Sequence, residues 1–263
     1  MTENEKEVPV PGKVPDEWDF YLTRLDDAGA SFFLNFWFRK RAPLPGVDTL
    51  YRCDLEMIDP GPHGLGEEAD AEALQVLEEK ILDRAGEHGL YFVGRIRWKG
   101  SWLLHFFGPP GQCSELETAT RTAMEGGTNR RFTVDSTEDS EWSHYVDFLF
   151  PDDDRWQWIQ DRHSVEDLLQ HGDKLELPRR VDHWIFFDTA KQRNAFLREA
   201  VELDYGVEPS HGKSDDGKYC AQVHRVSAVE LEEIHDVVMS LIELADAHDG
   251  EYDGWETTVE TGL

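Results

Sequence analysis

LYFVGRIRWKGSWLLHFF, residues 90–107, is the stretch that decides the fold. Apolar side chains recur at alternate positions on both sides of Lys99-Gly100-Ser101, and such alternation is typical of a half-buried strand. We expect Leu90, Phe92, Ile96 and Trp98 on one face of the first strand, with Trp102, Leu104 and Phe106 continuing the pattern on the second. Because a short glycine-containing turn separates the two runs, the stretch predicts a β-hairpin.

Helical patterns lie on both sides of this hairpin. Leu74, Leu77, Ile81 and Ala85 recur at helical spacing within residues 67–85, and a weaker helix is expected from about 114 to 125. Strand patterns at 50–58 and 131–135 enclose both helices. Residues 49–136 therefore show the order β-α-β-β-α-β, which is typical of a ferredoxin-like domain with an antiparallel sheet. A strand at 31–38, joined by a loop to the strand at 50–58, would add an edge.

The same order returns in the second half of the chain. Strands are predicted at 181–187, 205–211, 218–226 and 251–259. Thr189 with Gln192, and Ser227 with Glu230, have the spacing of capping boxes, so a helix is expected after each pair. The fold class is therefore α+β, with two ferredoxin-like (βαββαβ) antiparallel-sheet domains in tandem.

Between the two halves, residues 138–176 are expected to form a helical connection. Asp152, Asp153 and Asp154 suit a helix N-terminus, where carboxylates accept hydrogen bonds from free N–H groups. Ser164 is expected to open another short helix that ends near Gly172. The predicted organisation is a flexible tail (1–17), an N-terminal domain (18–150), the helical connection (151–176) and a C-terminal domain (177–263).

The charge balance limits the possible partners. The 263 residues include 55 Asp and Glu against 26 Lys and Arg, a formal net charge of −29. Residues 1–150 hold 28 acidic and 15 basic residues, and the remainder holds 27 and 11. Phosphate backbones and anionic membranes would repel such a chain, so we expect neither direct nucleic-acid binding nor membrane binding. A protein with a basic surface is the expected partner, although acidity that serves solubility alone would give the same composition.

The cysteines and the N-terminus indicate a cytoplasmic protein. Cys53, Cys113 and Cys220 are far apart in sequence, which argues against a disulfide scaffold. The first ten residues lack the basic and apolar regions of a secretory signal. No motif for a cofactor or a phosphate loop is present, so we expect no cofactor and no bound metal.

The last predicted strand holds the first group of candidate residues. Asp253-Gly254 inside a strand indicates a β-bulge, and Trp255 is expected to pack against the final helix. Alternatively, Tyr252, Asp253 and Trp255 form part of a partner surface, because aromatic residues anchor interfaces.

Two further groups could carry chemistry. Asp182 and Trp184 should share one face of a strand and His183 the other, so a catalytic Asp–His pair is the less favoured interpretation. His211, His224 and Cys220 could approach across a hairpin and bind zinc, but their spacing matches no zinc signature.

The end of the chain resembles a known family. The segment from Ala245 to Glu256 contains Tyr252-Asp253-Gly254-Trp255 in the last strand, after a helix and a Gly break, and is similar to the regulator of ribonuclease E activity B family. The segment from Pro178 to Phe187 is similar to the first strand of longer members. The resemblance implies a ferredoxin-like fold and an acidic protein that binds ribonuclease E and lowers its RNA-cleaving activity.

Residues 16–155 resemble a family of unknown function that often precedes this domain. Val93-Gly94-Arg95-Ile96, the strand from Trp102 to Phe107, and the run from Asp139 to Tyr145 that continues to Pro151 carry this resemblance. This resemblance implies a related fold and does not identify an activity.

The sequence thus predicts a non-catalytic regulator that binds a ribonuclease, of ribonuclease E type, through an acidic surface. The candidate contact residues are Asp182, Trp184, Tyr252, Asp253, Gly254, Trp255 and Glu256. A hydrolase or small-molecule site in a cleft between the two domains is the alternative, and a homodimer that pairs sheet edges or faces is a third option.

Overall fold

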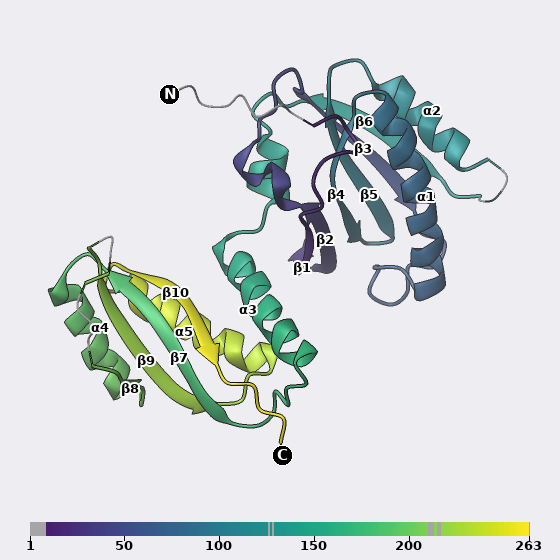
Figure 1. The fold of residues 1–263 in the computed structure, drawn as a ribbon. Coiled ribbons are helices and arrows are strands. Elements are labelled where there is room, and N and C mark those ends of the chain that lie inside the picture. Colours follow the sequence, from purple (N-terminus) through teal and green to yellow (C-terminus); the bar gives the residue numbers. More distant parts are fainter. Residues whose placement is uncertain (1–8, 126, 128, 210–212, 215–216, 263) are drawn as a thin grey trace. The chain divides into compact units, whose positions relative to one another are not determined.

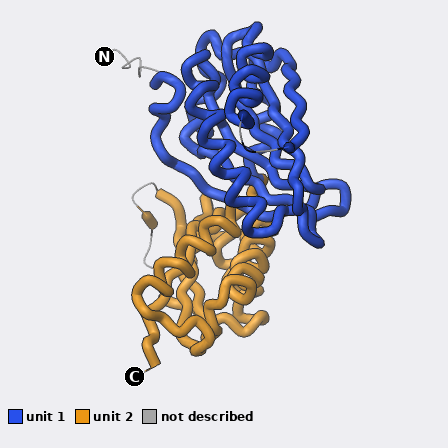
Figure 2. The backbone as a smooth tube through the Cα atoms, turned by 90° about the vertical axis from the view of Figure 1, so that its right-hand side faces the viewer, with its two compact units in different colours: residues 1–151 blue, residues 152–263 orange. Residues whose placement is uncertain are grey.

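A computed structural model describes residues 9–125, 127, 129–209, 213–214 and 217–262. The chain divides into two compact units, residues 1–151 and 152–263 (Figure 2). Each unit has its own sheet and its own helices, so each is described by itself. None of the described helices combines the length and the hydrophobicity that crossing a bilayer requires.

The first unit is built on a six-stranded antiparallel sheet with the strand order β1-β2-β4-β5-β3-β6. Its helices α1 and α2 lie on one side of this sheet (Figure 1). The elements in chain order are β1 (Trp18–Leu25), β2 (Ala28–Asn35), the 3-10 helix η1 (Phe36–Lys40), β3 (Thr49–Glu56), α1 (Glu68–Glu87), β4 (Tyr91–Trp98), β5 (Ser101–Gly108), α2 (Cys113–Ala123), β6 (Phe132–Glu138) and the π-helical turn η2 (His144–Leu149).

The hairpin predicted from residues 90–107 is confirmed as β4 and β5, but its predicted faces are wrong. A β-bulge lies between Phe92 and Gly94, because Phe92 pairs with Phe106 and Gly94 with His105. The extra residue reverses the alternation, so Phe92 packs in the core under α1 and α2 while Ile96 turns to the opposite face. The apolar alternation alone does not reveal this bulge, although Gly94 inside the strand is a local signal for it.

The sheet edge also differs from the prediction. Strand β2 pairs with β1 and β4 and not with β3, and the run from Phe36 to Lys40 is a 3-10 helix. The sequence pattern missed β1, which pairs with β2 through a two-residue turn at Asp26 and Asp27, both in the left-handed region. The described part of the predicted tail is packed on the unit, because the carbonyl of Pro9 accepts a hydrogen bond from Tyr91.

Both faces of the first sheet are covered. Helices α1 and α2 bury one face, with Leu77, Ile81 and Leu116 against Trp102 and Phe106. A second aromatic layer from the segment around η2 covers the other face. It comprises Trp142, which stacks on Phe107 at 4.0 Å, Tyr145, whose hydroxyl donates to the carbonyl of Asn35, and Leu149, whose carbonyl accepts from Tyr21. The central strands of this sheet therefore lie between two layers, whereas most of β6 and Phe20 and Leu22 of β1 are exposed.

The second unit is built on a four-stranded antiparallel sheet with the strand order β10-β7-β9-β8. Its elements are α3 (Asp153–Gln170), β7 (Arg179–Phe187), α4 (Ala190–Glu202), β8 (Gly206–Val207), β9 (Tyr219–Ser227), α5 (Leu231–Asp246) and β10 (Gly250–Thr257). Figure 1 shows α5 behind the strands β10, β7 and β9. The mixed α and β composition and the antiparallel sheets confirm the coarse fold class.

The helix ends agree with the sequence in part. Asp152 caps α3 by accepting a hydrogen bond from the Arg155 N–H, and the capping box of Thr189 and Gln192 is present. The predicted capping box at Ser227 is wrong, since Glu230 is the N-cap of α5 and its side chain makes no capping bond. The helix predicted to open at Ser164 is likewise wrong, because α3 continues without a break to Gln170 and packs on α5 within the second unit.

Candidate functional site

Strand β7 places the candidate residues on two different faces of the second sheet. Val181, His183, Ile185 and Phe187 are buried beneath the helices, whereas Asp182, Trp184 and Phe186 are half-buried on the opposite face. Since successive strand side chains point to opposite faces, the pattern follows from the backbone alone. The predicted separation of Asp182 and Trp184 from His183 is confirmed.

Strand β10 contains the β-bulge that the Asp253-Gly254 pair predicts. Tyr252 lies opposite Ile185 and Gly254 lies opposite Trp184, so Asp253 is the extra residue. Without a bulge, Tyr252 and Trp255 would point to opposite faces, because they are three residues apart. The bulge brings both to the face that the helices cover.

Tyr252 is fixed by a hydrogen bond inside the unit. Its hydroxyl lies 2.8 Å from Nδ1 of His183. Burial, followed by the nearby Asp161 carboxylate, raises the pKa of Tyr252, and burial lowers the pKa of His183 to about 4. Both side chains are therefore neutral near pH 7, and the pair joins β10 to β7 on the covered face.

Trp255 is fixed by a buried carboxylate on α3. Its Nε1 donates to Oδ1 of Asp161 at 2.9 Å, and Nδ1 of His235 on α5 lies 2.8 Å from Oδ2 of the same residue. Gln157 donates to Asp161 as well, so the carboxylate is both buried and well supplied with donors. The expected packing of Trp255 against the final helix is confirmed, because its ring lies against the cluster of Ile234 and Val238.

The opposite face of this sheet has no helix over it within the described part of the second unit. We call it the open face. Cross-strand pairs place Trp184 beside Gln222 and Gly254, and Phe186 beside Cys220 and Glu251. The open face comprises Arg180, Asp182, Trp184 and Phe186 of β7, Cys220, Gln222, His224 and Val226 of β9, and Glu251, Asp253, Gly254 and Glu256 of β10.

Carboxylates dominate the charge of the open face. Arg180 forms ion pairs with both Asp182 and Glu208, and its hydrogen bonds lower the pKa of the Asp182 carboxyl. Asp253 and Glu256 are exposed, and neither has an ion-pair partner among the described residues. Burial and then the Asp253 carboxylate raise the pKa of the Cys220 thiol.

Four residues of this region were not candidates from the sequence. Phe186 belongs to the same alternation as Trp184, so the pattern contained the signal for it. Arg180 and Glu208 meet only through the pairing of β7, β9 and β8. Asp161, which is distant from Trp255 in sequence, had no signal of its own.

Comparisons with known proteins match the two units to two families. The profile of "Regulator of ribonuclease activity B" matches residues 158–257, and that of "Family of unknown function (DUF695)" matches residues 16–150. The regulator of ribonuclease activity B from Salmonella typhi is 30% identical over 99 residues, covering 36% of this chain and 72% of that protein.

The chain belongs to the regulator of ribonuclease activity B family. Its first unit belongs to the family of unknown function DUF695. A second regulator of this name, from Photobacterium profundum, is 31% identical over 106 residues, covering 38% of this chain and 78% of that protein. A solved structure of an unknown protein from Galdieria sulphuraria has 8% identity and a TM-score of 0.22, with 81% of this chain and 99% of that chain covered.

The regulator match begins within α3 and ends at the last residue of β10. It therefore includes both Asp161 and Trp255, the two ends of the hydrogen bond that ties α3 to the sheet. Residues 151–176, which were predicted to form a connection, thus contribute α3 to the second unit, called the regulator unit below.

The described part of the regulator unit does not bring together the two groups of residues that the sequence offered for chemistry. Asp182 and His183 lie on opposite faces of β7 and cannot act as a pair. His224 and Cys220 share the open face, while His211 lies outside the described residues. Within the described part of the chain, no group of three or more His, Cys, Asp or Glu could hold a metal ion.

Proposed function

We propose that this chain is a non-catalytic regulatory protein that binds a ribonuclease, of ribonuclease E type, through the open face and lowers or modulates its activity. The observation that carries the proposal is the presence of Trp184 and Phe186, together with the exposed carboxylates of Asp253 and Glu256, on a sheet face without a helix in the described residues. The relatives named above, both regulators of ribonuclease activity, support the choice of partner.

Both parts of this face suit a protein partner with a basic surface. Aromatic rings near the centre of an interface contribute most of its affinity, because they bury a large area at a small cost in side-chain entropy. Carboxylates at the rim attract lysine and arginine, and they act mainly on the association rate. Val226, which is 68% exposed, lies on the same face of β9 opposite Arg180, apart from the two aromatic residues.

Tyr252 and Trp255 enter this proposal as positioning residues. Their polar atoms bind His183 and Asp161, so they hold β10 in place and leave the contact with the partner to Asp182, Trp184, Asp253, Gly254 and Glu256. We further propose that both units are ferredoxin-like and that the protein acts in the cytoplasm. The shared strand order of β4-β5-β3-β6 and β8-β9-β7-β10 supports the first of these two points.

The test is the binding of the full-length chain to purified ribonuclease E, measured at low and at high salt together with RNA cleavage. We expect Trp184→Ala to weaken binding by about 10- to 30-fold, the effect of a typical aromatic hot spot. The double variant Asp253→Asn and Glu256→Gln should slow association and reduce the salt dependence of binding.

Two controls separate the open face from acidity in general. The double variant Glu232→Gln and Glu233→Gln removes two exposed charges from α5 and should leave binding within about twofold. Tyr252→Phe removes an internal hydrogen bond, so it should lower stability and leave affinity unchanged. An equal loss of binding in the α5 variant, or unchanged binding in Trp184→Ala, would refute the open face as the contact surface.

A further inference from the structure

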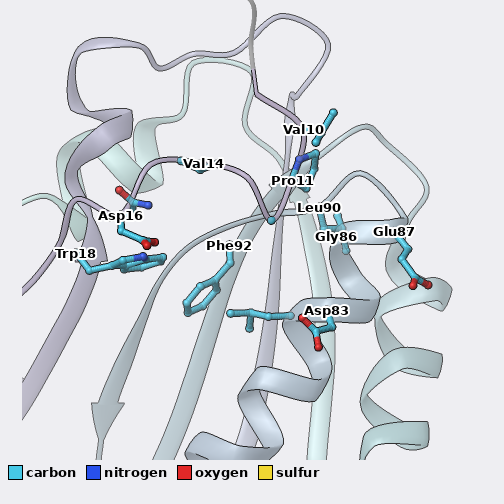
Figure 3. Close-up of a pocket in the computed structure, with 13 residues that line it drawn as sticks. Val10, Pro11, Val14, Asp16, Trp18, Asp83, Gly86, Glu87, Leu90 and Phe92 are labelled. Atoms are coloured by element: carbon cyan, nitrogen blue, oxygen red, sulfur yellow. The ribbon is translucent and has the colours of Figure 1, made fainter.

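The first unit contains a pocket of about 510 Å³ that the two family matches leave without a role. It lies between residues 10–16, the last turns of α1 and the beginning of β4, and Figure 3 shows the side chains that line it. Pockets that bind small molecules in proteins fall in the same range of volume.

The segment that crosses this pocket is fixed near both of its ends. The Tyr91 hydroxyl donates to the carbonyl of Pro9 at 3.0 Å, and Nδ2 of Asn35 donates to the carbonyl of Pro15 at 3.0 Å. Pro11 lies against Gly86 near the end of α1. The outer wall of the pocket is therefore part of the folded unit.

The inner surface of the pocket is apolar and aromatic. Trp18, Leu82, Leu90 and Phe92 line it. The Trp18 ring stacks on Phe33 with centroids 5.0 Å apart and lies 5.3 Å from the Phe92 ring, so its position is fixed by neighbours on two strands. Such a surface suits the hydrocarbon part of a ligand.

The charged residues of the pocket are all acidic. Asp16, Asp83 and Glu87 line it, and the lining includes no Lys, Arg or His among the described residues. None of the three carboxylates has an ion-pair partner within the part of the chain that the structure describes. Figure 3 shows Asp16 beside Trp18, and Asp83 of α1 on the other side of Phe92.

We propose that this pocket binds a linear aliphatic diamine. Its methylene chain would lie on Phe92 and Leu82, and its two ammonium groups would reach Asp16 and Asp83. The three carboxylates are exposed at the edge of the pocket, where they disfavour an anion, and a neutral ligand would leave their charge unmatched. A single metal ion would need ligands that converge on one point, whereas Asp16 and Asp83 lie on separate sides of an apolar surface.

The experiment is calorimetric titration of the full-length chain, in physiological salt, with diaminoalkanes from 1,3-diaminopropane to 1,8-diaminooctane. Affinity should pass through a maximum at one chain length, because only one spacing of the ammonium groups matches both carboxylates. Butylamine and 1,6-hexanediol, which lack one or both charges, should bind at least about fivefold more weakly than the best diamine. Magnesium chloride tests for plain counter-ion binding to a chain of net charge −29.

Variants locate the site. Asp16→Asn and Asp83→Asn should each weaken the best diamine about fivefold, whereas Glu72→Gln, an exposed residue of the same helix outside the pocket, should have no effect. The indole N–H resonance of Trp18, assigned with Trp18→Phe, should shift on titration. Affinity that is independent of chain length, an equal loss in Glu72→Gln, or no heat at millimolar diamine would overturn the proposal, and none of these results bears on ribonuclease binding.

Discussion

Four strands of each sheet share one strand order, but among the described residues only the first unit has a second layer over the other face of its central strands. Strands β4-β5-β3-β6 of the first unit and β8-β9-β7-β10 of the second follow the same sequence of pairings, with α1 and α2 on one face of the first sheet and α3, α4 and α5 on one face of the second. In the first unit the aromatic layer of Trp142 and Tyr145 covers the other face. In the described part of the second unit, that face carries half-buried aromatics and exposed carboxylates.

The difference shows how one scaffold can serve stability or recognition. A sheet face closed by a second layer contributes hydrophobic burial to folding and leaves little surface for a partner. A face left open loses that burial, and its aromatic residues stay available for an interface. Coverage of the second face, rather than strand order, therefore separates the two units.

The prediction with the largest expected effect compares one tryptophan on each of these faces. Trp142 is fully buried and stacks on Phe107, whereas Trp184 is half-buried. We expect Trp142→Ala to lower the free energy of unfolding by about 3–5 kcal/mol, the cost of deleting a buried aromatic ring. Trp184→Ala should cost less than about 1 kcal/mol, as at a surface site.

Urea unfolding of the full-length variants, followed by circular dichroism, gives the two values, and hydrogen exchange assigns each loss to a unit. Equal costs for the two substitutions would show that Trp184 is part of a closed core. The open face would then not exist in solution.

A smaller effect should appear as a dependence of stability on pH. His144 stacks on His105 beneath the aromatic layer, and burial lowers the pKa of His144 to about 4 and that of His105 well below its usual range. The unfolded chain, whose histidines have a pKa of about 6.5, binds more protons than the folded chain at pH values between 4 and 6.5, so stability is full above pH 6.5 and falls as pH drops toward 4.

His144→Phe keeps an aromatic ring at this position and removes the titration of His144, while His105 remains. We expect the variant to match the parent at about pH 7.5 and to exceed its free energy of unfolding by up to about 2 kcal/mol at about pH 4.5. Unfolding at the two pH values measures the difference. A variant that gains nothing at the lower pH would show that the covering layer does not exclude water from the histidine pair.

The smallest test compares two glycines at β-bulges. Gly94 and Gly254 have nearly the same φ, 159° and 155°. Replacing either glycine with alanine should therefore have a similar cost in backbone conformation. A Cβ at Gly94 would lie 2.4 Å from Leu34 Cδ2 and 2.6 Å from the Phe33 carbonyl oxygen, whereas a Cβ at Gly254 would meet nothing within 4 Å. We expect Gly94→Ala to cost about 1–3 kcal/mol more than Gly254→Ala in thermal or urea unfolding. A cost at Gly254 as large as that at Gly94 would mean that its face is closed.

Much of the fold could be predicted from the sequence because it rests on local signals. The alternation of β7 assigns Asp182 and Trp184 to one face, the Asp253-Gly254 pair indicates the bulge, and Thr189 with Gln192 marks the start of α4. Each signal acts over a few residues, where backbone geometry and steric limits decide the outcome. The errors also have local causes: the bulge at Phe92 adds one residue and reverses every later side chain of β4.

The acidic composition, most of the order of strands and helices, and the periodicity that gives each strand two faces are all properties of the amino-acid sequence. Which face is covered depends on the tertiary structure. Trp255 reaches Asp161, and Trp142 reaches Phe107, through contacts between residues far apart in the chain. The alternation of a strand determines which side chains share a face. Whether that face is buried depends on packing by segments distant in sequence, which no local pattern predicts.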